Sequence, residues 1–202
     1  QQFRDDLSRS IALIGDITGQ KVRYYRVPGF SIKKTNAWVL EILVESGIEI
    51  DSSIFPASRG HGGFEDFGSD TPVIIKTQAG KLKEFPINTS LFLGRRIVFS
   101  GGGYFRLLPY SILYNFMKKS SYVMSYFHPR DFDPDQPLLP GLNFNRRFKS
   151  YYGISGALKK LSRIMSDFEF TDLRTAESMI DWFARAGEPK KLSNGMILQP
   201  QM

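Results

Sequence analysis

The chain has 202 residues, 42% of them hydrophobic, and a formal net charge of +7 at pH 7. This length suits one domain with a sizeable core. The absence of cysteine excludes disulfides and thiolate metal sites, and no apolar run reaches the roughly 18 residues of a membrane-spanning helix. The basic pairs are scattered along the chain, so we expect no nucleic-acid partner, whereas an anionic polysaccharide or a membrane surface stays open.

The first part of the chain alternates between helix and strand patterns. Apolar residues three or four apart predict a helix over residues 1–18, ended by Gly19. A short strand over residues 22–26, a helix over 36–46 and a strand over 48–50 follow. This order is typical of a βαβ unit, which would make the two strands parallel.

The middle of the chain reads as an antiparallel insertion over about residues 56–105, with a long loop and short strands at 73–76, 82–87 and 96–99. The loop 129–150 contains four prolines, and the tail 187–202 is expected to be loose. The remaining elements are expected as helix, strand, helix, strand and helix, in this order: 109–119, 122–127, 155–166, 168–170 and 172–186.

This order of elements predicts an α/β fold that starts on a helix. A parallel sheet or barrel seldom starts there, because the first helix needs a preceding strand to pack on. We therefore expect residues 1–186 to form a domain that is truncated at its N-terminus, followed by the tail 187–202.

Three polar residues stand at the ends of predicted strands. Arg26 could hold a carboxylate through two hydrogen bonds, or could be an ordinary surface arginine before a turn. Asp51 could orient a histidine, accept a sugar hydroxyl or cap a turn. His128 could be a general acid–base group, or could cap its strand. Because parallel barrels build their sites at several strand ends, the three together indicate a site.

Other candidate motifs point to no chemistry. The glycines 101–103 lack the spacing of a phosphate-binding loop, and more plausibly allow close backbone approach or positive φ. The second histidine, His61, falls in a loop and reads as exposed. The sequence holds no His-x-x-x-His or other metal motif, and no Gly-x-Ser-x-Gly, which disfavours a serine hydrolase.

Five segments together resemble the polysaccharide deacetylases of the NodB-homology family of carbohydrate esterases, closest to the subgroup found in bacterial exopolysaccharide gene clusters. The resemblance runs from residue 1 to about residue 185. The segments that carry it are RVPGFSI at 26–32, DSSIFP at 51–56, EFP at 84–86, SGGGYFRLLPY at 100–110 and YFHPRD at 126–131.

The resemblance implies a distorted (β/α) barrel and a divalent metal, often zinc, that supports N-deacetylation of an acetylated amino-sugar polysaccharide or its precursor. Arg26 resembles the arginine that holds the catalytic aspartate, and His128 resembles the general acid. Asp51 resembles the acidic residue that tunes this histidine. Three further residues are expected to wall the acetyl pocket: Tyr104, Leu107 and Phe127.

The sequence departs from this family in one important respect. The Asp-Asp and His-x-x-x-His motifs, which supply the base and the metal ligands, are not present. We therefore expect these residues alone to bind no metal and to be inactive, and to need an oligomer or a complementing N-terminal segment. The alternative is a non-catalytic module that binds glycan. The resemblance implies a bacterial protein, either cytoplasmic or associated with the cell envelope.

Overall fold

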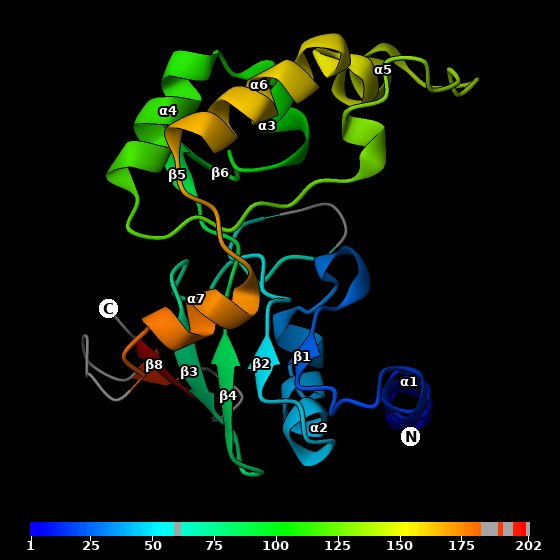
Figure 1. Cartoon of the computed structure of the whole chain (residues 1–202), viewed down its shortest axis with the longest axis vertical. Helices are drawn as coiled ribbons and strands as arrows, with labels where there is room; N and C mark the ends of the chain where they lie inside the picture. The colour runs from blue at the N-terminus through cyan, green and yellow to red at the C-terminus, as the bar shows by residue number, and fades with distance from the viewer. Residues whose placement is uncertain (59–61, 183–189, 192–195, 201–202) are drawn as a thin grey trace. The chain divides into compact units, whose positions relative to one another are not determined.

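The computed structural model describes residues 1–58, 62–182, 190–191 and 196–200. The chain forms two compact units, shown in Figure 1. Unit 1 consists of Gln1–Ile87 and Ile180–Met202, and unit 2 consists of Asn88–Met179. The predicted α/β class is confirmed, because helices and a mixed sheet both contribute to the fold.

Unit 1 is built on a six-stranded sheet. Its elements, in chain order, are α1 (Gln2–Thr18), β1 (Tyr24–Tyr25), η1 (Pro28–Phe30), η2 (Lys34–Asn36), α2 (Val39–Glu45), β2 (Ile50–Asp51), β3 (Val73–Lys76), β4 (Lys81–Glu84), β7 (Lys190–Lys191) and β8 (Ile197–Pro200). The strand order is β1-β2-β4-β3-β8-β7. Strands β1, β2 and β4 run parallel, and their arrows point the same way in Figure 1; the other pairings are antiparallel. The predicted parallel strand–helix–strand unit is thus confirmed.

Apolar periodicity explains the core of unit 1. Helix α1 presents one face to the core and buries Leu7, and it ends at Gly19, whose φ of 65° suits a residue without a side chain. Helix α2 buries three apolar residues, and the first three residues of β3 are buried, as expected for a central strand. This core therefore fixes the sheet and, with it, the positions of the residues at the ends of its parallel strands.

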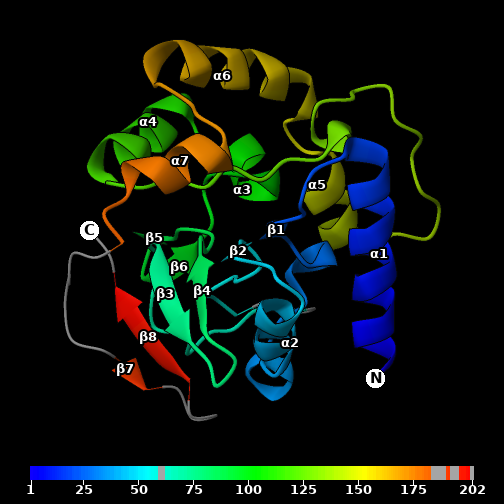
Figure 2. The ribbon, with the colours of Figure 1, turned by 60° about the horizontal axis from the view of Figure 1, so that its bottom comes forward.

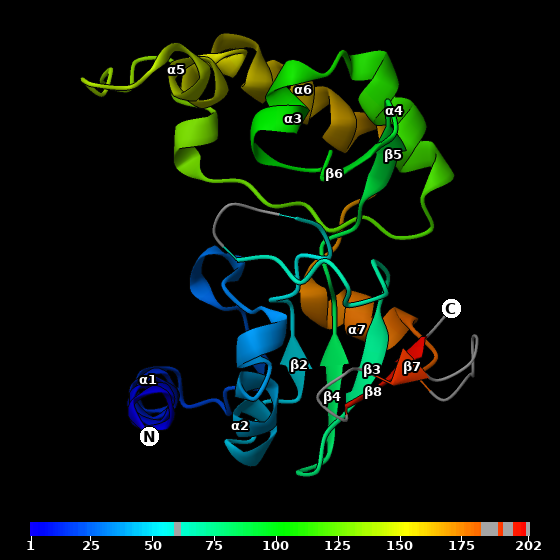
Figure 3. The same cartoon turned by 180° about the vertical axis from the view of Figure 1, so that it is seen from behind.

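Unit 2 is mainly helical. Its elements are β5 (Ser90–Phe92), β6 (Arg95–Ile97), α3 (Gly102–Leu107), α4 (Tyr110–Lys119), η3 (Pro129–Asp131), α5 (Phe144–Tyr151), α6 (Ile154–Asp167) and α7 (Leu173–Met179). Strands β5 and β6 pair as a small antiparallel sheet. Helices α3, α4 and α6 lie together in Figures 2 and 3. They share a core that includes the fully buried Phe99, Leu113 and Ile164.

Several expectations need correction. The described residues form no closed barrel, because the edge strands β1 and β7 of the sheet do not pair with each other. Strands β3 and β4 are not part of a separate insertion, since β4 pairs directly with β2. The tail is not wholly loose, since β8 hydrogen-bonds to β3. Residues 168–170 form no strand, and the segment 129–150 contains the unpredicted helix α5.

The predicted strand over residues 122–127 is replaced by irregular backbone with a single bridge between Gly101 and Tyr126. Side chains take over the hydrogen bonds of a neighbouring strand: the Met124 N–H donates to Oδ1 of Asn88, and the Ser100 hydroxyl donates to the Met124 carbonyl. A Cβ on Gly101 would lie 2.0 Å from the Tyr126 carbonyl oxygen. The glycine therefore serves close backbone approach, one of the two roles expected for it.

Candidate functional site

Three polar residues meet at the carboxyl edge of the parallel strands in unit 1. Tyr25, Asp51 and Glu84 occupy one row of the sheet, because Tyr25 is paired with Asp51 and Asp51 with Glu84. Arg26 follows directly after β1. The edge to which the three arrows point in Figure 1 therefore carries an arginine and two carboxyl groups. We call Arg26, Asp51, Ser52, Ser53 and Glu84 the carboxyl-edge cluster.

Asp51 and Glu84 are completely buried. Burial raises the pKa of Glu84 well above its ordinary value, and the neighbouring Asp51 raises it further. Burial also raises the pKa of Asp51. Oδ2 of Asp51 and Oε2 of Glu84 accept no hydrogen bond from any other described group. A proton on one carboxyl group can satisfy the free oxygen of the other, and the protonated form is favoured more strongly at Glu84 than at Asp51.

Serine hydroxyls connect this pair to the first strand. The Ser53 hydroxyl donates to Oδ1 of Asp51 over 2.5 Å and accepts from the Val27 N–H over 2.8 Å. Nε of Arg26 donates to the carbonyl and to the hydroxyl of Ser52, over 3.1 and 2.9 Å. The Arg26 guanidinium also lies over the Phe30 ring, 5.5 Å from its centre. The strand ends are therefore tied together, and the orientation of Arg26 is set.

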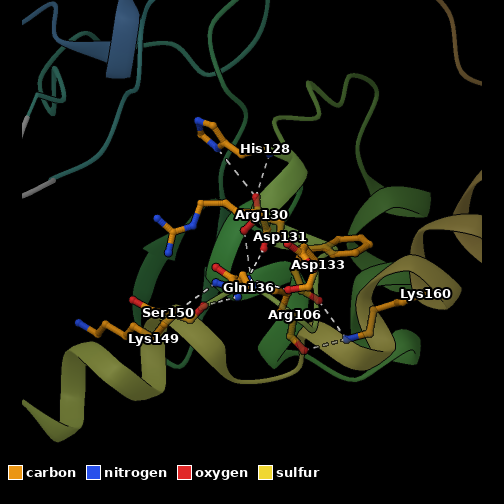
Figure 4. A network of polar contacts seen from close by, with 10 residues as sticks. Arg106, His128, Arg130, Asp131, Asp133, Gln136, Lys149, Ser150 and Lys160 are labelled. Carbon is orange, nitrogen blue, oxygen red and sulfur yellow. Dashed lines mark hydrogen bonds and ion pairs between the residues drawn. The ribbon is translucent and has the colours of Figure 1, made fainter. Parts of the chain in front are cut away.

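His128 belongs to unit 2. Its Nε2 lies 2.9 Å from the Tyr126 hydroxyl, and the two rings meet edge to face. The backbone N–H of His128 donates to Oδ2 of Asp131 over 2.9 Å, and its Nδ1 lies 3.9 Å from the same oxygen. Figure 4 shows His128 above Asp131. The ring is half exposed, so it is held from two sides and still reaches solvent.

Asp131 continues into a buried polar network, drawn in Figure 4. Its Oδ1 lies 3.6 Å from Nε of Arg106, and both side chains are buried. The Arg106 guanidinium donates to the carbonyls of Ser150 and Lys149, over 2.7 and 2.9 Å. Burial lowers the pKa of Arg106, and the charge of Asp131 opposes this change. The network links the His128 segment to the C-terminal end of α5.

Two of the three residues expected to wall a pocket do line one. Tyr104 and Leu107 border an open pocket of about 430 Å³ in unit 2. Its other lining residues are Gly103, Phe148, Lys149 and Tyr152. Phe127 is not among them, because its ring packs against Phe105 and Phe132 at 4.8 and 5.2 Å. Phe127 is thus partly buried against the core of unit 2, and its place in an acetyl pocket stays a prediction.

The predicted catalytic residues are brought together only in part. Arg26 and Asp51 lie in the carboxyl-edge cluster of unit 1, whereas His128 lies in unit 2. The carboxylate that contacts His128 within its own unit is Asp131. Sequence reasoning assigned no role to Glu84 or Asp131, although both lie in segments that carried the resemblance. His61 lies outside the described residues.

A metal centre needs at least three ligating side chains close together. Among the described residues, no group of three or more histidine, aspartate and glutamate side chains has the arrangement that would hold a metal ion. These residues by themselves therefore do not supply the ligand set of the divalent metal implied by the resemblance. In addition, none of the helices in these parts of the chain combines the length and apolar character that crossing a bilayer requires.

Comparison with known proteins gives one match. A family model described as "Domain of unknown function (DUF3473)" matches residues 52–177. The chain belongs to this family. No curated protein and no solved structure matches the chain. The DUF3473 match begins directly after β2 and covers Glu84, the pocket and His128, whereas Arg26 and Asp51 precede it.

Proposed function

We propose that the chain is part of a metal-dependent N-deacetylase that acts on an acetylated amino-sugar polysaccharide or its precursor. The observation that carries this proposal is the carboxyl-edge cluster, which gathers Arg26 and Asp51 at the ends of parallel strands. Enzymes with parallel strands build their sites at this edge. The five segments that resemble polysaccharide deacetylases support the proposal, as does the association of the DUF3473 family with such enzymes.

In the proposed reaction, a water oxygen bonds to the acetyl carbon, the C–N bond breaks, and the free amine takes up a proton. His128 donates that proton; Tyr126 and Asp131 hold its segment, and its ring is open to solvent. Arg26 is oriented by Ser52 and holds the carboxylate of the catalytic aspartate that the resemblance implies. That carboxylate accepts a proton from the attacking water. No step is assigned to the metal, because the described residues do not offer its ligand set.

The substitution His128→Ala in the intact enzyme tests the proposal. Turnover should fall roughly 10²–10⁴-fold, the usual contribution of a positioned acid, while the unfolding midpoint stays close to that of the wild type. The measurement is acetate release from an acetylated amino-sugar oligomer. His61→Ala is the matched control, because His61 is the only other histidine. Equal turnover of the His128 variant and the wild type would remove His128 from the mechanism.

A second candidate function is a non-catalytic glycan-binding module. The pocket favours it, because three aromatic rings, those of Tyr104, Phe148 and Tyr152, line an open space that would accept a sugar ring. This candidate predicts that the intact protein retains an amino-sugar oligomer without releasing acetate. Tyr104→Ala should then abolish retention, whereas His128→Ala should leave it unchanged.

A further inference from the structure

Helix α5 is amphipathic, but nothing in the described chain buries it. Phe144, Phe148 and Tyr151 are spaced four and three residues apart and therefore share one face. No residue of the helix is buried, and Phe144 is 81% exposed. A surface helix normally packs its apolar face on the core. The apolar face of α5 is instead open at Phe144 and only partly covered at Phe148 and Tyr151.

The preceding loop adds to this face. The Tyr151 hydroxyl accepts from the Leu139 N–H over 2.8 Å and donates to the Pro137 carbonyl over 3.1 Å. These two bonds attach the loop to the helix. Leu138 and Leu139 are 60% and 54% exposed, and the bonds hold them beside α5. We call Leu138, Leu139, Phe144, Phe148 and Tyr152 the α5 apolar surface.

This surface is fixed in place. The Asn143 side chain accepts from the Arg146 N–H and caps the start of the helix, while buried Arg106 donates to two carbonyls at its end. Gly153, directly behind the surface, packs so closely that a Cβ there would lie 2.7 Å from the Arg106 carbonyl oxygen. The exposed apolar residues therefore belong to a held element, with the open pocket beside it.

The segment that carries the surface is basic, although the exposed Asp133 and Asp135 stand just before it. Residues 136–166 contain six Lys and Arg and no Asp or Glu. Arg146, Arg147 and Lys149 are exposed on α5, and within the described residues their side chains form no ion pair. On a helical projection Arg147 flanks the apolar face, so its stem can cover apolar surface while its charge stays in water.

We propose that the α5 apolar surface and its three basic residues bind the headgroup region of an anionic lipid bilayer. Exposed phenylalanine and leucine with flanking arginine and lysine are the combination that lies in a membrane interface, where apolar side chains enter the acyl boundary and cations meet lipid phosphates. An anionic glycan would match the charge and the pocket rings Phe148 and Tyr152, but it would leave Leu138, Leu139 and Phe144 in water. The proposal does not rest on the deacetylase activity.

Cosedimentation with vesicles tests the proposal. The full chain is mixed with phosphatidylcholine vesicles that either contain or lack phosphatidylglycerol, and the bound fraction is measured. Arg146→Gln with Arg147→Gln should weaken binding to anionic vesicles about fivefold for each removed charge. Phe144→Ser should weaken it roughly tenfold. Circular dichroism of each variant establishes that the fold is retained.

Matched controls separate this surface from general charge and general exposure. Lys118→Gln with Lys119→Gln removes an exposed basic pair from α4, and Leu91→Ser removes a leucine that is 69% exposed on β5. Both control variants should bind anionic vesicles as the wild type does. Equal losses in control and test variants would overturn the proposal, as would the absence of binding to anionic vesicles.

A glycan arm of the same experiment gives the competing outcome. Soluble polygalacturonate is added in place of vesicles, and its retention by the wild type and the Phe144→Ser variant is compared. Retention that Phe144→Ser abolishes, together with no vesicle binding, would identify a glycan surface and overturn the proposal. Because neither arm measures acetate release, its result is independent of whether the deacetylase proposal holds.

Discussion

The two units place their charged groups in opposite ways. Unit 1 contains 14 Lys and Arg against 13 Asp and Glu, and it buries two carboxyl groups completely at the end of its parallel strands. Unit 2 contains 13 Lys and Arg against seven Asp and Glu, so it carries almost all of the net positive charge. Its buried ionic groups, Arg106 and Asp131, are paired with one another.

This difference separates two uses of charge. A buried carboxyl pair is stable only if the surrounding protein satisfies its hydrogen bonds, so the pair fixes the positions of the groups that contact it. Exposed unpaired cations cost little and attract an anionic partner from a distance. The contrast predicts that substitutions in the carboxyl-edge cluster change chemistry and pH dependence, whereas substitutions on α5 change association.

The largest expected effect is on stability and comes from unit 2, where one charged pair is buried and fixes geometry as the carboxyl pair of unit 1 does. Arg106→Met removes the partner of Asp131 and leaves two α5 carbonyls without their donor. Breaking a buried pair should lower the free energy of unfolding by about 3–5 kcal/mol. Urea denaturation measures the change, with Arg95→Met on exposed β6 as the control. A loss below about 1 kcal/mol, the median of surface pairs, would show that Arg106 behaves as a surface residue.

Arg26 sharpens the contrast on the catalytic side. If it holds a carboxylate through two hydrogen bonds, Arg26→Lys should lower turnover of the intact enzyme nearly as much as Arg26→Ala, about 10²-fold through misplacement of the base. Acetate release measures both variants. Arg23→Lys is the control, because Arg23 pairs with Glu49 at the amino ends of β1 and β2, opposite to the ends that carry Arg26 and Asp51. Recovery of activity with lysine would reduce Arg26 to a general positive charge.

The third effect is the smallest over a single pH unit, and it tests whether Glu84 keeps a proton in the folded protein. Because the pKa of Glu84 is raised in the folded protein, the folded state binds more protons than the unfolded state above its ordinary value of 4.5. The free energy of unfolding should therefore fall as pH rises above this value, by about 1.4 kcal/mol per pH unit, until the folded pKa is reached.

Glu84→Gln should remove this slope, because the amide is neutral at every pH and can still donate to Asp51 while accepting from the Ile54 N–H. Urea denaturation at several pH values between about 4.5 and 7 compares the two proteins. Glu41→Gln on α2 is the control. Parallel pH profiles of wild type and Glu84→Gln would contradict a proton held by this pair.

Periodicity was sufficient to predict the elements that face a core. The strand 73–76 and the helix 155–166 were predicted within one residue of β3 and α6, because β3 is a short continuous apolar run and the buried residues of α6 follow the helical period. Helix α5 was missed because its stability depends on Asn143 and on the distant Arg106, and the prolines before it indicated a loop. Contacts with such sequence separation leave no local pattern.

The candidate site divides in the same way. Arg26 and Asp51 could be found because each directly follows or ends a strand. Glu84 was not found, although the alternation Lys81-Leu82-Lys83-Glu84 puts it on the same face as the buried Leu82, because a glutamate in a strand usually faces solvent. Its burial comes from the parallel pairing of β4 with β2, which places it beside Asp51. Phe127 was expected in a pocket because it stands next to His128. The sequence could not exclude a place in the core, because an aromatic residue suits both positions.

The pairing of β3 with β8 has a consequence for how the protein is made. On the ribosome, Val73–Lys76 emerges long before Ile197–Pro200, and all of unit 2 is synthesised between them. Until β8 arrives, the apolar strand β3 is an open sheet edge, which is the kind of edge that pairs with other chains. Unit 2 can fold from local contacts during this delay, whereas the sheet of unit 1 closes last. Yield in the cell should therefore depend on how fast translation completes the final residues.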